Sequence, residues 1–204
     1  MNVLYFDIET TDLIEESVPI ADMEIGCLCT QMVNYPTHKS MNKAYVKGYG
    51  KLDTLVAWFN FADAVVGFNV NHFDYEVMSR HLATEGWKAK TIDMMETVVT
   101  GLGRRASLNT LTKRTLGQEK SMHGKEAVRL WQQGEYSKVT DYCFHDVQIM
   151  RLLFEHGCCE GSIKTYDAPS RQIIKIDTSR WVTEIGAFIP SPITASLPTV
   201  DVTI

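Results

Sequence analysis

The chain has 204 residues, of which 45% are hydrophobic and 22% are charged, and its formal net charge is −5. This length and composition fit one domain with a full hydrophobic core, and the negative charge argues against a simple nucleic-acid-binding protein. Neither a window of eighteen apolar residues nor a signal-peptide pattern occurs, so we expect a cytoplasmic protein without membrane association.

The first expected strand, residues 2–8, leads into two carboxylates. The residues from Val3 to Phe6 carry no charge, which is typical of a strand covered on both faces. Asp7 and Glu9 are two residues apart, so in a strand they point to the same side, at the end where open α/β sheets tend to place ligands. The spacing alone has little weight, because the same D-x-E pattern recurs at Asp22/Glu24 and Asp74/Glu76.

The following segments predict a mixed sheet with helices on its faces. Hydrophobic periodicity and turn residues indicate further strands at residues 24–33, 42–47, 63–68 and 89–94. They indicate helices at residues 52–59, 71–86, 107–117, 124–133 and 135–156, the last closed by Gly157. Three successive strands suggest an antiparallel meander, and the later alternation suggests parallel strands, so we expect an α/β fold with five strands.

Asp74 lies in the first turn of the helix expected over residues 71–86. An acid there complements the helix dipole, and Asn71 could cap the same helix, so a purely structural role is a sound alternative to a catalytic one.

A basic segment follows. Residues 86–129 carry nine Lys and Arg against four Asp and Glu, a net charge of +5, which leaves −10 for the rest of the chain. A local phosphate-binding flank beside an acidic centre fits this distribution, and a solvated helical face fits it about equally well.

The long helix expected over residues 135–156 carries Tyr142 and Asp146. They are four residues apart and therefore neighbours on one surface of the helix. Such a pair is common at ordinary helix surfaces, so it gains meaning only together with the other acids.

The C-terminal part differs in pattern from the rest of the chain. Residues 1–157 are expected to form the main domain, and residues 158–180 a C-terminal β-hairpin extension around the segment APSR. Residues 181–204 are rich in Pro, Thr and Ser, and we expect a loosely held tail.

The five cysteines are odd in number and include the adjacent Cys158 and Cys159, which is not the pattern of a disulfide framework. A zinc site could combine Cys27-x-Cys29 with His156-x-Cys158, but neither spacing matches a common finger. Buried free cysteines are the expected outcome.

Three segments together resemble a known family. "FDIE", "NVNHFD" and "YCFHD", in this order, resemble the three exonuclease motifs of the DEDD superfamily of 3′-to-5′ exonucleases. The match is to the tyrosine branch, DEDDy, which includes the proofreading domains of family B DNA polymerases, and the chain also looks like stand-alone predicted exonucleases. The histidine branch would need His five residues before Asp146, where this chain has Asp141.

The resemblance covers about residues 1–156 and implies a ribonuclease H-like fold. It implies that the catalytic, metal-binding acids are Asp7, Glu9, Asp74 and Asp146, with Tyr142 as a further catalytic residue. It also implies that Asn69 and Phe73 contact the terminal nucleotides. His145, directly before Asp146, points about 100° away around the helix and is expected to have a supporting or structural role.

Four converging carboxylates need cations, and hard oxygen ligands select Mg²⁺ or Mn²⁺ rather than zinc. Two such ions would clamp the scissile phosphate, and Tyr142 would orient the attacking water, because a phenol with a pKa of about 10 is a poor base at neutral pH. Phe73 could stack on a base or be a core aromatic. The candidates for contacts with the nucleic-acid backbone are Arg104, Arg105, Lys113 and Arg114, with Lys120 and Lys125 as weaker ones.

The sequence therefore predicts a metal-dependent exonuclease that releases nucleoside 5′-monophosphates from the 3′ ends of single-stranded or frayed DNA. A 3′-to-5′ exoribonuclease of the same fold and a catalytically silent nucleic-acid-binding module are the alternatives, although the intact acid set argues against the second. No polymerase or helicase domain is expected in this chain, so a separate replication or repair protein is a possible partner.

Overall fold

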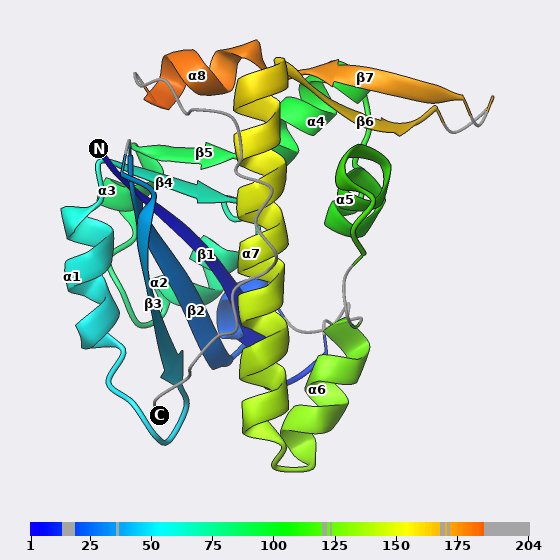
Figure 1. Ribbon diagram of the computed structural model, residues 1–204. Helices are drawn as coiled ribbons and strands as arrows, with labels where there is room; N and C mark the ends of the chain where they lie inside the picture. Colours follow the sequence, from blue (N-terminus) through cyan, green and yellow to red (C-terminus); the bar gives the residue numbers. More distant parts are fainter. Residues whose placement is uncertain are drawn as a thin grey trace.

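The computed structural model describes residues 1–13, 19–35, 37–119, 122, 124–167, 170 and 172–185. These residues form a five-stranded sheet with helices on both faces, followed by a two-stranded hairpin (Figure 1). The sheet strands are β1 (Asn2–Thr10), β2 (Ile25–Asn34), β3 (Lys39–Val46), β4 (Ala64–Gly67) and β5 (Thr91–Asp93). The hairpin strands are β6 (Ser162–Tyr166) and β7 (Ile173–Asp177).

A short 3₁₀ helix (Ile20–Asp22) and eight α-helices occur in the described part of the chain. The helices are α1 (Asp53–Phe61), α2 (Asp74–Ser79), α3 (Glu85–Lys88), α4 (Met94–Leu102), α5 (Leu108–Leu116), α6 (Gly124–Gln132), α7 (Tyr136–Glu160) and α8 (Ser179–Ile185). None of these helices is long and apolar enough to cross a membrane.

The strand order in the sheet is β3-β2-β1-β4-β5, with β1 in the centre. The pairs β1/β2 and β2/β3 are antiparallel, whereas β1/β4 and β4/β5 are parallel. The predicted α/β fold, with an antiparallel meander joined to parallel strands, is confirmed.

Strand β1 is buried on both faces of the sheet, as its uncharged sequence predicts. Tyr5 belongs to the core between the sheet and α7, whereas Leu4 and Phe6 belong to the core on the α1 side. Because side chains alternate along a strand, Asp7 and Glu9 continue the Tyr5 side and face α7. The period-two pattern thus fixes which helix the two carboxylates meet.

Helix α7 runs along one face of the sheet and contacts β1 and β2 (Figure 1). The stripe predicted for it, Val147, Met150 and Phe154, is buried against the sheet. This packing places Tyr142 and Asp146 beside β1.

A buried polar network fixes the position of α7 along β1. Glu155, which is 2% exposed, accepts a hydrogen bond from the Tyr35 hydroxyl and pairs with Arg151 Nε at 2.8 Å. The Tyr35 and Tyr5 hydroxyl oxygens are 3.0 Å apart. Breaking one member would leave buried polar groups unpaired, so the network disfavours sliding of the helix along the strand.

The single helix expected over residues 71–86 is wrong, because the chain forms the short helices α2 and α3 instead. Trp87, at the end of this region, stacks on Phe59 with 4.4 Å between ring centroids, and its indole N–H donates to Asn60 Oδ1 at 2.8 Å. Burying Trp87 against α1 requires the chain to turn after α2. Asn71 does not cap α2; its side chain donates to Glu96 Oε1.

Helix α4 begins at Met94, directly after β5. The sequence predicts a strand over residues 89–94 and gives no separate helix there, so the structure corrects both. Asp93, the last residue of β5, caps α4 by accepting from Met95 N at 2.9 Å. The next helix, α5, has the predicted ends, Ser107 as N-cap and Gly117 in the left-handed region with φ 72°.

Gly157 does not close α7, which continues to Glu160 and ends at Gly161 with φ 65°. A Cβ atom at Gly157 would lie 2.3 Å from the Trp181 ring. Trp181 is fully buried and stacks on Phe154 with 5.0 Å between centroids. Gly157 therefore provides space for an aromatic side chain that arrives later in the chain.

The expected C-terminal boundaries need correction for the same reason. The boundary after residue 157 falls inside α7, so the hairpin extension starts only after Gly161. The start of the expected loose tail, residues 181–185, belongs to α8, which Trp181 and Ile185 anchor in the core. Residues 186–204 lie outside the described residues.

Replacing Gly157 with Ala tests this packing. Alanine favours a helix interior over glycine by about 1 kcal/mol, but overpacking against Trp181 costs about 1–3 kcal/mol. We expect net destabilisation in denaturant unfolding, whereas Gly86→Ala in α3, where a Cβ meets nothing within 4 Å, should be neutral or stabilising. Equal stabilisation by both substitutions would contradict the packing role of Gly157.

Candidate active site

Strand β1 and helix α7 bring three carboxylates together. The ligand oxygens of Asp7, Glu9 and Asp146 all lie within 4.8 Å of one another. Asp7 and Glu9 are partly exposed, and Asp146 is 1% exposed. Asp146 lies 137 positions after Glu9 in the sequence, so the fold, and not a local motif, brings it to the two acids of β1.

Asp7 and Glu9 line a cleft of about 440 Å³ at the carboxyl end of β1. Its walls come from the end of β1, the loop after β4, the start of α2, the start of α6, and α7. The residues that line it include Asp7, Glu9, Phe68, Asn69, Phe73, Asp74, Lys125 and Tyr142. The expected position of the site at the end of a central strand is therefore matched by a cleft of small-ligand size.

Asp74 lines the same cleft but lies outside the group of three. It is 3% exposed, and its Oδ1 accepts a hydrogen bond from Ile8 N at 3.2 Å, between the two acids of β1. It lies in the first turn of α2, as expected. The fold thus places Asp7, Glu9 and Asp74 in the lining of one cleft, and it brings the buried Asp146 close enough to Asp7 and Glu9 for the three to share an ion.

Tyr142 lines the cleft and is hydrogen-bonded to Asp146, one helical turn later. Burial raises the pKa of the Tyr142 phenol well above its usual value of about 10, and the negative charges of Asp146 and Glu9 raise it further. The phenol is therefore neutral across the physiological pH range; its proton is donated to Asp146, and its oxygen can accept further hydrogen bonds.

The loop after β4 carries Asn69 in the left-handed region, with φ 69°. The Asp93 carboxylate holds this loop by accepting from Asn69 N at 2.7 Å and Asn71 N at 3.0 Å. Burial raises the pKa of Asp93 above its usual value, and the hydrogen bonds from these backbone donors offset only part of that effect. Sequence reasoning missed Asp93, whose only visible signal is an acid at the end of the β5 strand.

Phe73 and Phe68 both line the cleft and are half-buried. Phe73 also packs against the core on the α1 side. It is therefore partly a core aromatic and partly exposed to the cleft, where a base could stack on it. Phe68 was not identified from the sequence, although it lies next to Asn69 in the second motif region.

The four basic candidates occupy different positions. Arg105 donates to Asn69 Oδ1 at the edge of the cleft. Lys113 forms an ion pair with Glu119, and the exposed Lys125, a weaker candidate from sequence, lines the cleft itself. Lys120 lies outside the described residues. His145 is 3.3 Å from the Glu119 carbonyl oxygen and does not line the cleft.

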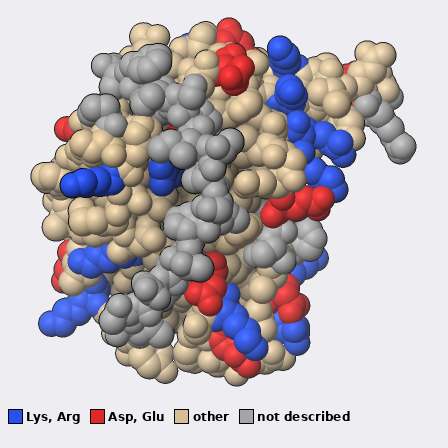
Figure 2. All heavy atoms as spheres, viewed as in Figure 1, with Lys and Arg blue, Asp and Glu red and all other residues tan. Residues whose placement is uncertain are grey.

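Arg104 and Arg114 are tied to the hairpin. Arg104 donates to the Tyr166 carbonyl oxygen at 2.7 Å, and the Arg114 guanidinium lies 4.0 Å from the Tyr166 ring centroid. Lys164 and Lys175 are directly opposite each other in the same hairpin. Figure 2 shows blue Lys and Arg side chains gathered over the hairpin and α5, at the upper right of the view.

The donor set of the cleft fits a hard divalent cation. Asp7, Glu9 and Asp146 offer carboxylate oxygens, the ligand type that Mg²⁺ and Mn²⁺ prefer, at mutual distances that one ion could bridge. Without a cation, the same three groups repel one another at close range.

A mixed sheet in the order β3-β2-β1-β4-β5, with carboxylates from its central strand and from a helix across it, defines a ribonuclease H-like protein. A family model described as RNase H superfamily matches residues 4–157, so the chain belongs to that superfamily. Membership suggests a hydrolytic nuclease that acts on nucleic acid, and such nucleases typically use divalent metal ions. None of the curated proteins matches this chain.

Metal binding should be visible in thermal unfolding. A cation that binds only the folded cluster at about 100 times its Kd raises the midpoint by about 5–10 °C in a chain of this size. We expect this response to Mg²⁺ or Mn²⁺ in the wild type and its loss in Asp7→Asn. Without metal, the variant should melt at the same temperature as the wild type or higher, because one repelling charge is removed.

The matched control is Asp22→Asn, which removes an exposed carboxylate of another D-x-E pair that neither lines the cleft nor belongs to the acidic cluster. It should keep the full metal response. A wild-type midpoint that is indifferent to millimolar metal would count against the site.

Proposed function

We propose that the protein is a metal-dependent 3′-to-5′ exonuclease of the DEDDy type that removes nucleoside 5′-monophosphates from single-stranded or frayed DNA. The observation that supports this most is the convergence of the buried Asp146 with Asp7 and Glu9, which line an open cleft, with Tyr142 hydrogen-bonded to Asp146. It joins the first and third motifs of the sequence in space, although 132 residues separate Glu9 from Tyr142.

The acids have distinct roles in this proposal. Asp7 faces both its strand neighbour Glu9 and Asp146 on α7, so it is placed to bridge two ions, with Glu9 and Asp146 completing one site. Asp74, which lines the cleft beside β1 but is outside the close group, would hold the second ion, partly through water. Mg²⁺ or Mn²⁺ bound there would supply water activation and stabilisation of the leaving 3′ oxygen.

Tyr142 orients the attacking water in this proposal. Its neutral phenol donates one hydrogen bond and accepts others, which suits a positioning group, whereas a phenol that stays protonated at neutral pH is a poor base. The hydrogen bond to Asp146 fixes the direction of the phenol within the cleft.

The loop after β4 would hold the 3′-terminal nucleotide. Asn69 and Phe73 line the cleft beside Asp74, and a base stacked on Phe73 or Phe68 would gain about 1–3 kcal/mol without sequence preference. Asp93 keeps the loop fixed through two backbone N–H groups, so the subsite exists before substrate binds.

The upstream strand would leave the cleft over the basic flank. An adjoining hollow runs from Asp7 and Tyr142 to the N-terminal residues of α5, Ser107 and Leu108, where the helix dipole favours a phosphate. Beyond it lie Arg114 and the opposed pair Lys164 and Lys175, whose like charges are unfavourable without an anion between them. A polyanionic backbone along this path would relieve that repulsion.

An exonuclease assay tests the proposal. A 5′-labelled DNA oligonucleotide with Mg²⁺ or Mn²⁺ should shorten stepwise from its 3′ end and release nucleoside 5′-monophosphates. We expect Asp7→Asn to slow this by about 10²–10³-fold or more, while Asp22→Asn retains the wild-type rate. Chelation by EDTA should stop the reaction.

A matched RNA strand in the same assay separates the two sugar specificities. Shortening of RNA alone would assign the protein as an exoribonuclease of the same fold. The absence of any metal-dependent shortening beyond the Asp7→Asn background, with substrate binding retained, would indicate a catalytically silent binding module and contradict the proposal.

The role of Tyr142 predicts a specific kinetic defect. Tyr142→Phe keeps the ring but removes the hydroxyl, so kcat should fall about 10–100-fold with little change in KM or in the metal response of the melting curve. Tyr136→Phe, on the same helix but outside the cleft lining, should leave kcat unchanged. An unchanged kcat in Tyr142→Phe would exclude a part for the hydroxyl in the reaction.

A further inference from the structure

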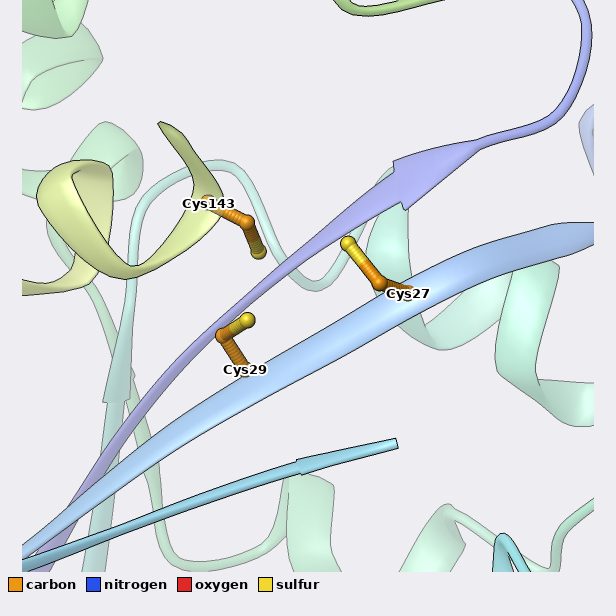
Figure 3. Close-up of side chains that lie close together, drawn as sticks. All are labelled: Cys27, Cys29 and Cys143. Carbon is orange, nitrogen blue, oxygen red and sulfur yellow. The ribbon is translucent and has the colours of Figure 1, made fainter. Parts of the chain in front are cut away.

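Three cysteines converge directly behind the acidic cluster. Cys27 and Cys29 extend from β2 and Cys143 from α7, and the three side chains point toward one another (Figure 3). Their sulfur atoms all lie within 4.8 Å of one another, and all three residues are 0% exposed. A second group of possible metal ligands therefore lies next to the first, but it is made of sulfur and closed to solvent.

The fold explains why the two groups are neighbours. In the β1/β2 register Asp7 pairs with Cys29 and Glu9 with Cys27, so acids and thiols share one face of the sheet. Cys143 directly follows Tyr142 on α7, and its Sγ lies 3.3 Å from the Asp7 carbonyl oxygen. The same strand-to-helix contact thus assembles both groups.

The sulfur spacing suits coordination. For thiolates bound at about 2.3 Å in a tetrahedral zinc site, neighbouring sulfur atoms are about 3.8 Å apart. The sulfurs here are within 4.8 Å, so shifts of about 1 Å or less would bring them onto one ion. A disulfide between Cys27 and Cys29 is disfavoured, because their Cα atoms are about 7 Å apart along one strand.

Simple packing is the competing explanation. In the thiol form, Cys29 Sγ donates a hydrogen bond to the Thr140 carbonyl oxygen at 3.6 Å. Cys143 Sγ donates one to the Asp7 carbonyl oxygen at 3.3 Å. Free cysteines are often buried in this way, but packing requires no convergence of three sulfurs from two elements. The convergence is the observation that points to a ligand.

We propose that Cys27, Cys29 and Cys143 bind one soft, thiophilic cation. Zn²⁺ and Cu⁺ are the two biological ions with this ligand preference. Thiolate sulfur selects such ions over Mg²⁺ and Mn²⁺, whereas the carboxylates of the cleft have the opposite preference. Each thiol releases its proton to solvent as it binds the cation. Three sulfurs complete a trigonal site for Cu⁺, and the Thr140 carbonyl oxygen next to Cys29 can supply a fourth ligand to Zn²⁺.

The bound ion has a structural role. A closed site without an open position does not admit substrate, and it ties β2 to α7 on the side of β1 that carries Asp7. The proposal does not depend on the nuclease activity, because ion binding and stability are measured separately from hydrolysis.

Cadmium is the probe, because its thiolate complexes have an ultraviolet charge-transfer band that carboxylate complexes lack. The full chain is reduced, refolded with Cd²⁺ in the presence of excess Mg²⁺ to fill the acidic cluster, and desalted. We expect one Cd²⁺ per chain, the sulfur band, and a higher melting temperature than that of the metal-free protein. Parallel anaerobic samples with Zn²⁺ and with Cu⁺ identify which ion competes for the same site.

Cys143→Ala and Cys29→Ser should weaken Cd²⁺ binding by about 100-fold or more, because each removes one of three ligands. Cys158→Ser changes a buried cysteine outside the group and should bind as the wild type does. Retention of the band in Cys143→Ala, or its loss in Cys158→Ser with native circular dichroism, would contradict the assignment.

The wild-type measurement decides the matter even where a variant does not fold. A native wild-type chain that takes up neither Cd²⁺ nor Cu⁺ with sulfur ligation would overturn the proposal and leave the cysteines as packing residues.

Discussion

The surrounding fold holds Asp7, Glu9 and Asp146 together against their mutual repulsion. Two unit charges 4.8 Å apart repel by about 3.5 kcal/mol at an effective dielectric constant of about 20, and this site contains three such groups. The rest of the fold holds them together: β1 is buried on both faces, and α7 is fixed by packing and by the Glu155 network. The cluster therefore lowers the free energy of unfolding, and a bound divalent cation would offset this by neutralising the charges.

The elements that carry the site were predictable from the sequence because their signals are local. The uncharged run before Asp7 indicates a central strand, and the spacing of Tyr142 and Asp146 indicates one helical surface. Turn and cap residues likewise predict α5 and the β6/β7 hairpin. The order of the motifs along the chain suggests that the acids converge, but only the fold shows that Asp7, Glu9 and Asp146 lie within reach of one ion and that Asp74 is bonded to β1 beside them.

The features missed by sequence reasoning all depend on distant contacts. Gly157 has the signature of a helix end, yet it lies inside α7 because Trp181, 24 residues later, packs against it. Trp87 likewise divides the helix expected over residues 71–86 by packing on α1. Asp93 gives no motif, because its role is to hold backbone N–H groups of another loop. The convergence of Cys143 with the cysteines of β2 is visible only after α7 is placed on the sheet.

The proposed metal site can be seen by anomalous diffraction from crystals grown with Mn²⁺ and a nucleoside 5′-monophosphate. We expect manganese peaks between Asp7, Glu9 and Asp146, with a second peak on the Asp74 side of the cleft when the nucleotide phosphate is bound. A cleft without manganese at millimolar concentrations, or manganese bound only elsewhere on the molecule, would contradict it.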